Sequence, residues 1–163
     1  MKKIIIITLV LVLSFSGCKN SEECNIAPAG YSFDAKITVG DFNAAAYVSV
    51  FGGGILKIQF KSPENISGLC FEITENNCAL SKDGIDFVKD MPAEKTGELC
   101  VLSGAFMRLI TAGQSAKKAG ACFEYNGVYN NNEFKFIINN EGFPTRLEIP
   151  KINLISEFSN WKY

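Results

Sequence analysis

Apolar and polar side chains alternate along most of the chain from residue 31 onward, which is the period-two pattern of strands with one buried face. Tyr31, Phe33, Ala35 and Ile37 hold apolar positions of the first such strand. The connections are short and leave no room for parallel crossovers, so they predict an antiparallel meander. The predicted strands cover residues 31–39, 42–50, 56–61, 66–74, 78–81, 85–88, 121–129, 133–139 and 145–161, the last being an edge or bulged strand at Pro150.

Residues 99–110 follow a different period. Their apolar residues recur at spacings of three and four, which places them on one stripe of an α-helix. The stripe consists of Leu99, Leu102, Phe106, Leu109 and Ile110, with Thr96 as the expected N-cap and Gly113 as the expected stop. The order of strands, helix and further strands predicts an α+β domain. We expect a strongly curved antiparallel β-sheet, a half-barrel meander, with one main helix covering its concave face.

A helix in this position can cover the sheet directly, or it can line a cavity that holds an apolar ligand. The second hypothesis assigns the lining to one face of the strands and to the helix stripe, and a register shift of one residue would exchange the two faces. In the alternative, the same residues are simply core. The candidate cavity residues are Val48, Val50, Leu56, Ile58, Phe60, Leu69, Phe71, Ile73, Leu102, Phe106 and Leu109.

The first eighteen residues have the organisation of an export signal. A basic start at Lys2 and Lys3 precedes an apolar stretch at 4–13, which is too short for a spanning helix of roughly 20 residues. The segment Ser16-Gly17-Cys18 resembles the bacterial lipobox, whose cysteine becomes the lipid-modified first residue of the mature protein. This resemblance implies a signal peptide at 1–17 and a diacylglyceryl group on Cys18. It also implies a location on the extracytoplasmic face of the cell membrane.

Composition supports one globular domain behind this anchor. Polar and small residues at 18–29 predict a flexible tether, and residues 30–163 predict a single half-barrel domain. A hydrophobic content of 47% and a net charge of -1 exclude a disordered chain and a strongly basic nucleic-acid-binding protein. The basic residues are almost all lysines, with Arg108 and Arg146 the only arginines, so nucleic acid is not expected as a partner.

The chain has six cysteines. If Cys18 is acylated, an odd set remains, so at least one thiol is unpaired within the chain. We expect Cys70 and Cys122, which lie inside predicted strands, to be buried thiols. The full remaining set is Cys24, Cys70, Cys78, Cys100 and Cys122.

The residues that carry most enzyme chemistry are missing or poorly placed. The chain has no histidine, which removes the commonest general base and the usual zinc ligand. Asp83 and Asp86 lie around a predicted turn that is open to solvent, which is an unfavourable place for a catalytic pair of carboxylates. Ser115 and Lys118 match a Ser-x-x-Lys spacing, which we interpret as a chance match on a lysine-rich surface. The sequence therefore predicts no enzyme, no cofactor and no metal site.

Two short segments carry a second resemblance. They are Ser62-Pro63-Glu64-Asn65-Ile66-Ser67-Gly68, leading into residues 69–73, and Gly142-Phe143-Pro144-Thr145-Arg146-Leu147-Glu148-Ile149. Together with the order of strands and helix, they resemble half-barrel lipoprotein carriers of the LolA, LolB and LppX type and related sensor domains. The resemblance implies a bowl-shaped sheet and a helical lid around a cavity for acyl chains.

Two functional hypotheses follow. In the first, a membrane-anchored lipoprotein binds a lipid or another hydrophobic ligand in a cavity between sheet and helix. In the second, the protein is a sensor or protein-interaction module of the cell envelope, with a filled core and no ligand. The volume of the space between helix and sheet separates the two.

Overall fold

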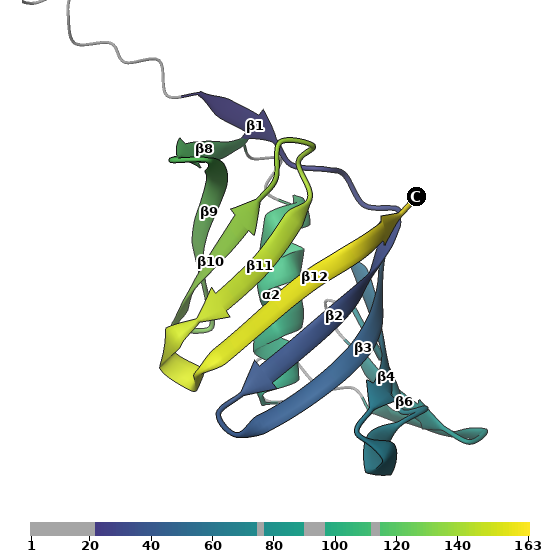
Figure 1. Cartoon of the computed structure of the whole chain (residues 1–163). Coiled ribbons are helices and arrows are strands. Elements are labelled where there is room, and N and C mark those ends of the chain that lie inside the picture. The colour runs from purple at the N-terminus through teal and green to yellow at the C-terminus, as the bar shows by residue number, and fades with distance from the viewer. Residues whose placement is uncertain (1–21, 75–76, 90–96, 112–114) are drawn as a thin grey trace, which may run out of the picture.

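The alternating segments form one curved antiparallel sheet around a helix in the computed structural model of the chain (Figure 1). The structure describes residues 22–74, 77–89, 97–111 and 115–163. The strands in these residues are β1 (Glu23–Asn25), β2 (Tyr31–Val39), β3 (Phe42–Phe51), β4 (Ile55–Ser62), β5 (Cys70–Ile73), β6 (Cys78–Lys82), β7 (Ile85–Lys89), β8 (Ser115–Ala119), β9 (Cys122–Tyr129), β10 (Asn132–Ile138), β11 (Pro144–Ile149) and β12 (Leu154–Lys162).

The strands follow the order β1-β8-β9-β10-β11-β12-β2-β3-β4-β5-β6-β7, and all neighbours pair antiparallel. Two meanders, β2 to β7 and β8 to β12, therefore make up most of the sheet. The long pairing between β12 and β2 joins them, with Phe158 opposite Ala35. The structure confirms the predicted strongly curved antiparallel sheet with one main helix.

The helix α2 (Glu98–Thr111) lies along the hollow side of the sheet (Figure 1). Three residues of its predicted stripe, Leu102, Phe106 and Leu109, are at most 1% exposed. The proposed cap and stop at Thr96 and Gly113 lie outside the described residues. Within the part of the chain that the structure describes, no helix is long and apolar enough to cross a membrane.

Two glycines let the helix approach the sheet closely on both sides. The ring of Tyr129 in β9 occupies the space where a side chain on Gly104 would lie. On the other side, the end of the Met107 side chain lies against Gly54 in the turn between β3 and β4. Because glycine has no Cβ, both contacts are possible without displacing the helix. The helix therefore bridges the two meanders.

The N-terminal part of the described chain packs against the sheet. Glu23 in β1 lies opposite Lys117 in β8, and the Ala27 amide donates a hydrogen bond of 2.9 Å to the Gly142 carbonyl. Ala27 is buried in the main hydrophobic core. At residues 22–29 the structure thus differs from the predicted flexible tether, while 18–21 lie outside the described residues. The sequence did not reveal β1 because three residues carry too little alternation to be recognised.

The last predicted strand is two strands. Pro150 opens a short 3-10 helix, Pro150–Ile152, and Asn153 then adopts a left-handed conformation with φ 50°. The chain reverses there, so β11 and β12 pair with each other. The break at Pro150 is confirmed, but the edge position is wrong, because β12 lies between β11 and β2 in the sheet.

Cys24, Cys70 and Cys122 are free thiols. Cys24, Cys70, Cys78 and Cys122 are each half-buried, so Cys70 and Cys122 are less enclosed than expected. Cys18 and the side chain of Cys100 lie outside the described residues. In the regions that the structure describes, no three side chains of Cys, Asp or Glu are grouped so that they could hold a metal ion.

Candidate functional site

The strand residues predicted to line a cavity all lie on the inner face of the sheet. Val48 in β3 lies opposite Ile58 in β4, which lies opposite Phe71 in β5. Such a row of residues that lie opposite one another on neighbouring strands is a rung of the sheet. Leu56 and Ile73 belong to a second rung. The pairing register therefore places these residues together on the inner face of the sheet. Val48, Val50, Leu56, Ile58, Phe60 and Ile73 are at most 4% exposed, whereas Leu69 and Phe71 are half-buried and pack against the core.

Burial decreases along one of these rungs. Phe33 in β2, Val48 and Ile58 are at most 1% exposed. The next two residues of the rung, Phe71 and Leu80 in β6, lie opposite each other and are only half-buried. The apolar inner face thus extends beyond the part that is fully enclosed.

Aromatic rings fill the enclosed half. The Phe106 ring of α2 is stacked on Phe33 at 5.5 Å between centroids and meets Phe136 and Phe158 edge-on at 5.0 and 5.2 Å. Such pairs contribute about 0.5–1.5 kcal/mol each beyond their buried area. The cluster joins the helix to β2, β10 and β12. The space between α2 and the strands β2, β10 and β12 is therefore filled by side chains of the protein itself.

Trp161 belongs to this aromatic cluster because of a bulge. The inner residues of β12 are Leu154, Ser156 and Phe158, and strict alternation would point Trp161 outward. Asn160 instead adopts φ 56°, and the pairing register with β2 shifts between Ser159 and Lys162. The extra residue turns the Trp161 ring inward.

The indole of Trp161 lies 4.4 Å from Phe33, 5.3 Å from Tyr31 and 5.0 Å from Phe143. Sequence reasoning omitted these residues from the candidate site. The alternation of β2 and β10 could have identified Tyr31, Phe33 and Phe136, but it could not have identified Trp161.

Two buried hydroxyl groups make no hydrogen bond in the described structure. They belong to Tyr31, which is 3% exposed, and to Ser156, which is 0% exposed and lies opposite the buried Ile37 and Leu147. Burial, with a smaller effect from Tyr163, raises the pKa of the Tyr31 phenol, which therefore stays neutral. Leaving such a group unpaired costs about 1–3 kcal/mol.

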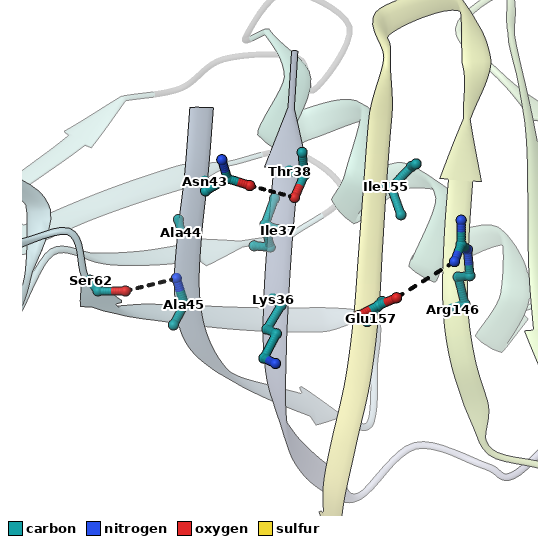
Figure 2. A pocket seen from close by; sticks show the side chains of 10 residues that line it. All are labelled: Lys36, Ile37, Thr38, Asn43, Ala44, Ala45, Ser62, Arg146, Ile155 and Glu157. Atoms are coloured by element: carbon teal, nitrogen blue, oxygen red, sulfur yellow. Dashed lines mark hydrogen bonds and ion pairs between the residues drawn. The ribbon is translucent and has the colours of Figure 1, made fainter. Parts of the chain in front are cut away.

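The outer face carries a shallow hollow of about 480 Å³ over β2, β3, β11 and β12, and both apolar and polar side chains line it. The Thr38 hydroxyl donates a hydrogen bond of 2.8 Å to the side-chain oxygen of Asn43, and Figure 2 draws this pair at the hollow. Arg146 and Glu157 form an ion pair of 3.5 Å at one side of the hollow (Figure 2). The polar groups here largely satisfy one another. The lining consists of Lys36, Ile37, Thr38, Asn43, Ala44, Ala45, Ser62, Arg146, Ile155 and Glu157.

Beside this hollow, Glu148 lies between two cations. Lys135 Nζ is 3.1 Å and Arg146 Nε is 2.8 Å from its carboxylate. The hydrogen bond from Lys135 is the main reason that the pKa of Glu148 lies below its ordinary value, and the charge of Arg146 acts in the same direction. Partial burial opposes them.

We expect Lys135→Ala to raise the pKa of Glu148 in an NMR titration of the side-chain carboxyl. Because the folded pKa is lowered, the pair stabilises the fold above the ordinary pKa of glutamate, and this contribution is lost as the pH falls through the folded pKa. Since both side chains are partly exposed, the effect on unfolding is at most about 1 kcal/mol. Lys36→Ala on the same face is the control, and an equal pKa change in both variants would contradict the assignment.

Comparisons with known proteins give structural similarity only. No family model matches the chain, and no curated protein matches its sequence. A LolA superfamily protein from Nitrosomonas europaea is similar with a TM-score of 0.41 and 9% identity, covering 88% of this chain and 86% of the other. A DUF1329 family protein from Desulfovibrio piger gives 0.39 and 9%, with 94% and 90% covered.

A third similar structure is named as an outer membrane lipoprotein-sorting protein domain from Vibrio parahaemolyticus. It has a TM-score of 0.37 and 9% identity, with 82% of this chain and 85% of the other covered. A LolA superfamily protein and a lipoprotein-sorting protein domain are thus among the similar structures. Because all three scores lie below 0.5, the function of this chain has to be derived from its own residues.

Proposed function

We propose that the protein is an extracytoplasmic lipoprotein, held on the cell membrane through a diacylglyceryl group on Cys18. On the inner face of its sheet, at β4 to β6 beside α2, it binds a lipid or another hydrophobic ligand. The lipobox and the export signal before it support the anchor. A single observation carries the ligand proposal: the inner face stays apolar beyond the enclosed core.

The half-buried apolar side chains on this part of the inner face include Leu69, Phe71 and Leu80. A bound ligand would remove their remaining exposed surface from water, and each buried methylene contributes about 0.8 kcal/mol. A flexible acyl chain suits such a surface, because dispersion and burial need no fixed polar partners. The neighbouring core, closed by Phe106 and Phe33, would form a rigid wall for this ligand.

A second function is favoured by one observation. The aromatic cluster under α2 fills the space beside β2, β10 and β12 with the chain's own rings. If the filling extends to β4 to β6, the protein is a sensor or protein-interaction module of the cell envelope that has no ligand. The ligand experiment separates the two functions.

Phe71 and Glu72 are adjacent in β5 and lie on opposite faces, which allows the same glutamine to be introduced on each side. We expect Phe71→Gln to weaken the binding of a fatty acid or an apolar fluorescent dye about tenfold, because it exchanges a half-buried ring for an amide. Glu72→Gln on the outer face should leave binding unchanged. Fluorescence titration and native mass spectrometry of the full chain provide the two measurements.

Ligand masses retained by the wild-type protein, together with dye uptake sensitive to Phe71→Gln alone, are the expected result. Only apo mass and no uptake in the wild-type protein would contradict ligand binding and would favour the interaction module. Equal loss of binding in both variants would contradict this location of the site.

A further inference from the structure

We propose that one end of the half-barrel rests on the bilayer, and that exposed aromatic side chains at this end contact the lipid headgroups. This anchored end is formed by β1, the turn at 139–143, Phe51, and residues 161–163. The inference depends on the proposed lipid anchor at Cys18. It adds an orientation of the domain and a surface that contacts the membrane.

The first step is the length of chain between Cys18 and the sheet. The Glu22 carbonyl already accepts a hydrogen bond of 2.9 Å from the Lys118 amide, and β1 begins at Glu23. Only residues 19–21 separate Cys18 from Glu22. A fully extended chain gains about 3.3–3.6 Å per residue, so Glu22 lies within about 14 Å of Cys18. The anchor therefore keeps β1 close to the membrane surface.

The second step is the arrangement of the strand ends. In Figure 1, β1, β8, the turn between β10 and β11, and the end of β12 lie at the upper end of the molecule, whereas the turn between β2 and β3 lies at the lower end. Phe51 is the last residue of β3 and adjoins Val50, whose carbonyl accepts a hydrogen bond of 2.8 Å from the Gly30 amide. Lys162 pairs with Ser32 on the other side of β2. Phe51 and Tyr163 therefore lie at the same end of the sheet.

The third step is the chemistry of this end. Phe51 is 47% exposed, Tyr163 is 83% exposed, and the Tyr163 ring lies 5.3 Å from Phe143. Trp161 is half-buried beside them. Tryptophan and tyrosine prefer the headgroup layer of membranes, where one side of the ring meets apolar surface and the polar atom meets water. A protein held against a bilayer at this end would place these rings in that layer.

At the edge of the sheet formed by β1 and β8, two lysines lie beside two glutamates, so their charges cancel. Lys118 forms an ion pair with Glu22, and Lys117 lies opposite Glu23. Contact with the membrane therefore depends on the anchor and the aromatic rings rather than on attraction to anionic lipids. We expect it to change little between low and moderate salt, since the screened term is small.

The ends of β3 offer a matched pair of probes. Phe42 and Phe51 are 45% and 47% exposed and are the first and last residues of this ten-residue strand. A strand of this length spans roughly 30 Å. Trp161 is the only tryptophan of the chain, so Trp161→Phe provides a background in which Phe51→Trp or Phe42→Trp is the single fluorophore.

The experiment uses the full lipid-modified chain in vesicles of phosphatidylglycerol and phosphatidylethanolamine with brominated acyl chains. We expect the Phe51→Trp fluorophore to be quenched several-fold more strongly than the Phe42→Trp fluorophore. The unaltered protein gives a second measurement that needs no substitution, because Trp161 itself should be quenched by the brominated vesicles. Equal quenching of the two probes, stronger quenching of Phe42→Trp, or an unquenched Trp161 would overturn the proposed orientation.

Vesicle flotation separates this inference from the proposal on which it rests. If the wild-type protein floats with vesicles and the Cys18→Ala variant does not, the anchor stands and the quenching ratio decides the orientation. If the wild-type protein does not float, or if Cys18→Ala floats equally well, the anchor is wrong and the orientation is overturned with it.

Discussion

Phe106→Ala is expected to lower the free energy of unfolding by about 3–5 kcal/mol, because it opens a cavity among rings that cannot collapse into it. Phe106 is fully buried and contacts Phe33, Phe136 and Phe158, which come from three separate strands. Its ring therefore holds α2 against both meanders at once. A loss of this size is a large share of the 5–15 kcal/mol typical of a domain.

Urea denaturation followed by far-ultraviolet circular dichroism measures this change. Phe42→Ala is the matched control, since it removes the same ring from a position that is 45% exposed. We expect the control to change the unfolding free energy by less than about 1 kcal/mol. A loss below about 1 kcal/mol for Phe106→Ala would show that the aromatic cluster is not tightly packed. Such a result would also favour an open space between α2 and the sheet over a filled core.

Gly142→Ala is expected to have the second largest effect, a loss of about 3 kcal/mol that is concentrated in the N-terminal segment. Gly142 has φ 86°, and a Cβ there would collide with the backbone oxygen of Asn25 and press on the amide of Ala27. The Ala27 amide would also lose its bond to the Gly142 carbonyl. The strain can be relieved most easily if residues 22–29 detach from the turn.

Hydrogen exchange at the Ala27 amide and urea denaturation together measure this effect. Gly68→Ala is the control, because Gly68 has a similar φ of 82° and nothing within 4 Å of the added Cβ. It carries the conformational cost of about 1–2 kcal/mol without the collision. We expect Gly142→Ala to lose protection at Ala27 and Gly68→Ala to keep it. Similar protection in both variants would contradict the role of this close contact.

The faces of the central strands could be predicted from the sequence. The alternation of Val48 and Val50 with Tyr47 and Ser49 places the valines on one side of β3, and the structure buries them at 1% exposure. The helix stripe of Leu102, Phe106 and Leu109 is equally clear. In both cases one side of a regular helix or strand is buried away from water. The buried positions are therefore apolar and recur with the period of the element, which makes them recognisable in the sequence.

Other parts of the candidate site could not be predicted in this way. Trp161 faces inward only because Asn160 adds one residue to β12 against β2, and an isolated asparagine does not signal such a bulge. The pairing of β1 with β8 is another case. It joins residues about 90 positions apart through backbone hydrogen bonds. The pattern of apolar and polar side chains carries no information about such backbone pairing.

The sequence by itself determined the helix, most of the strands, the buried face of each central strand and the break at Pro150. These depend on backbone freedom and on hydrophobic period, both of which are local properties of the chain. Only the tertiary structure decided that β12 pairs with β2, that β1 extends the sheet, and that aromatic rings from β2, β10 and β12 meet under α2. Those features depend on contacts between distant residues, where many pairings satisfy the same local pattern and the packing of the whole core selects one.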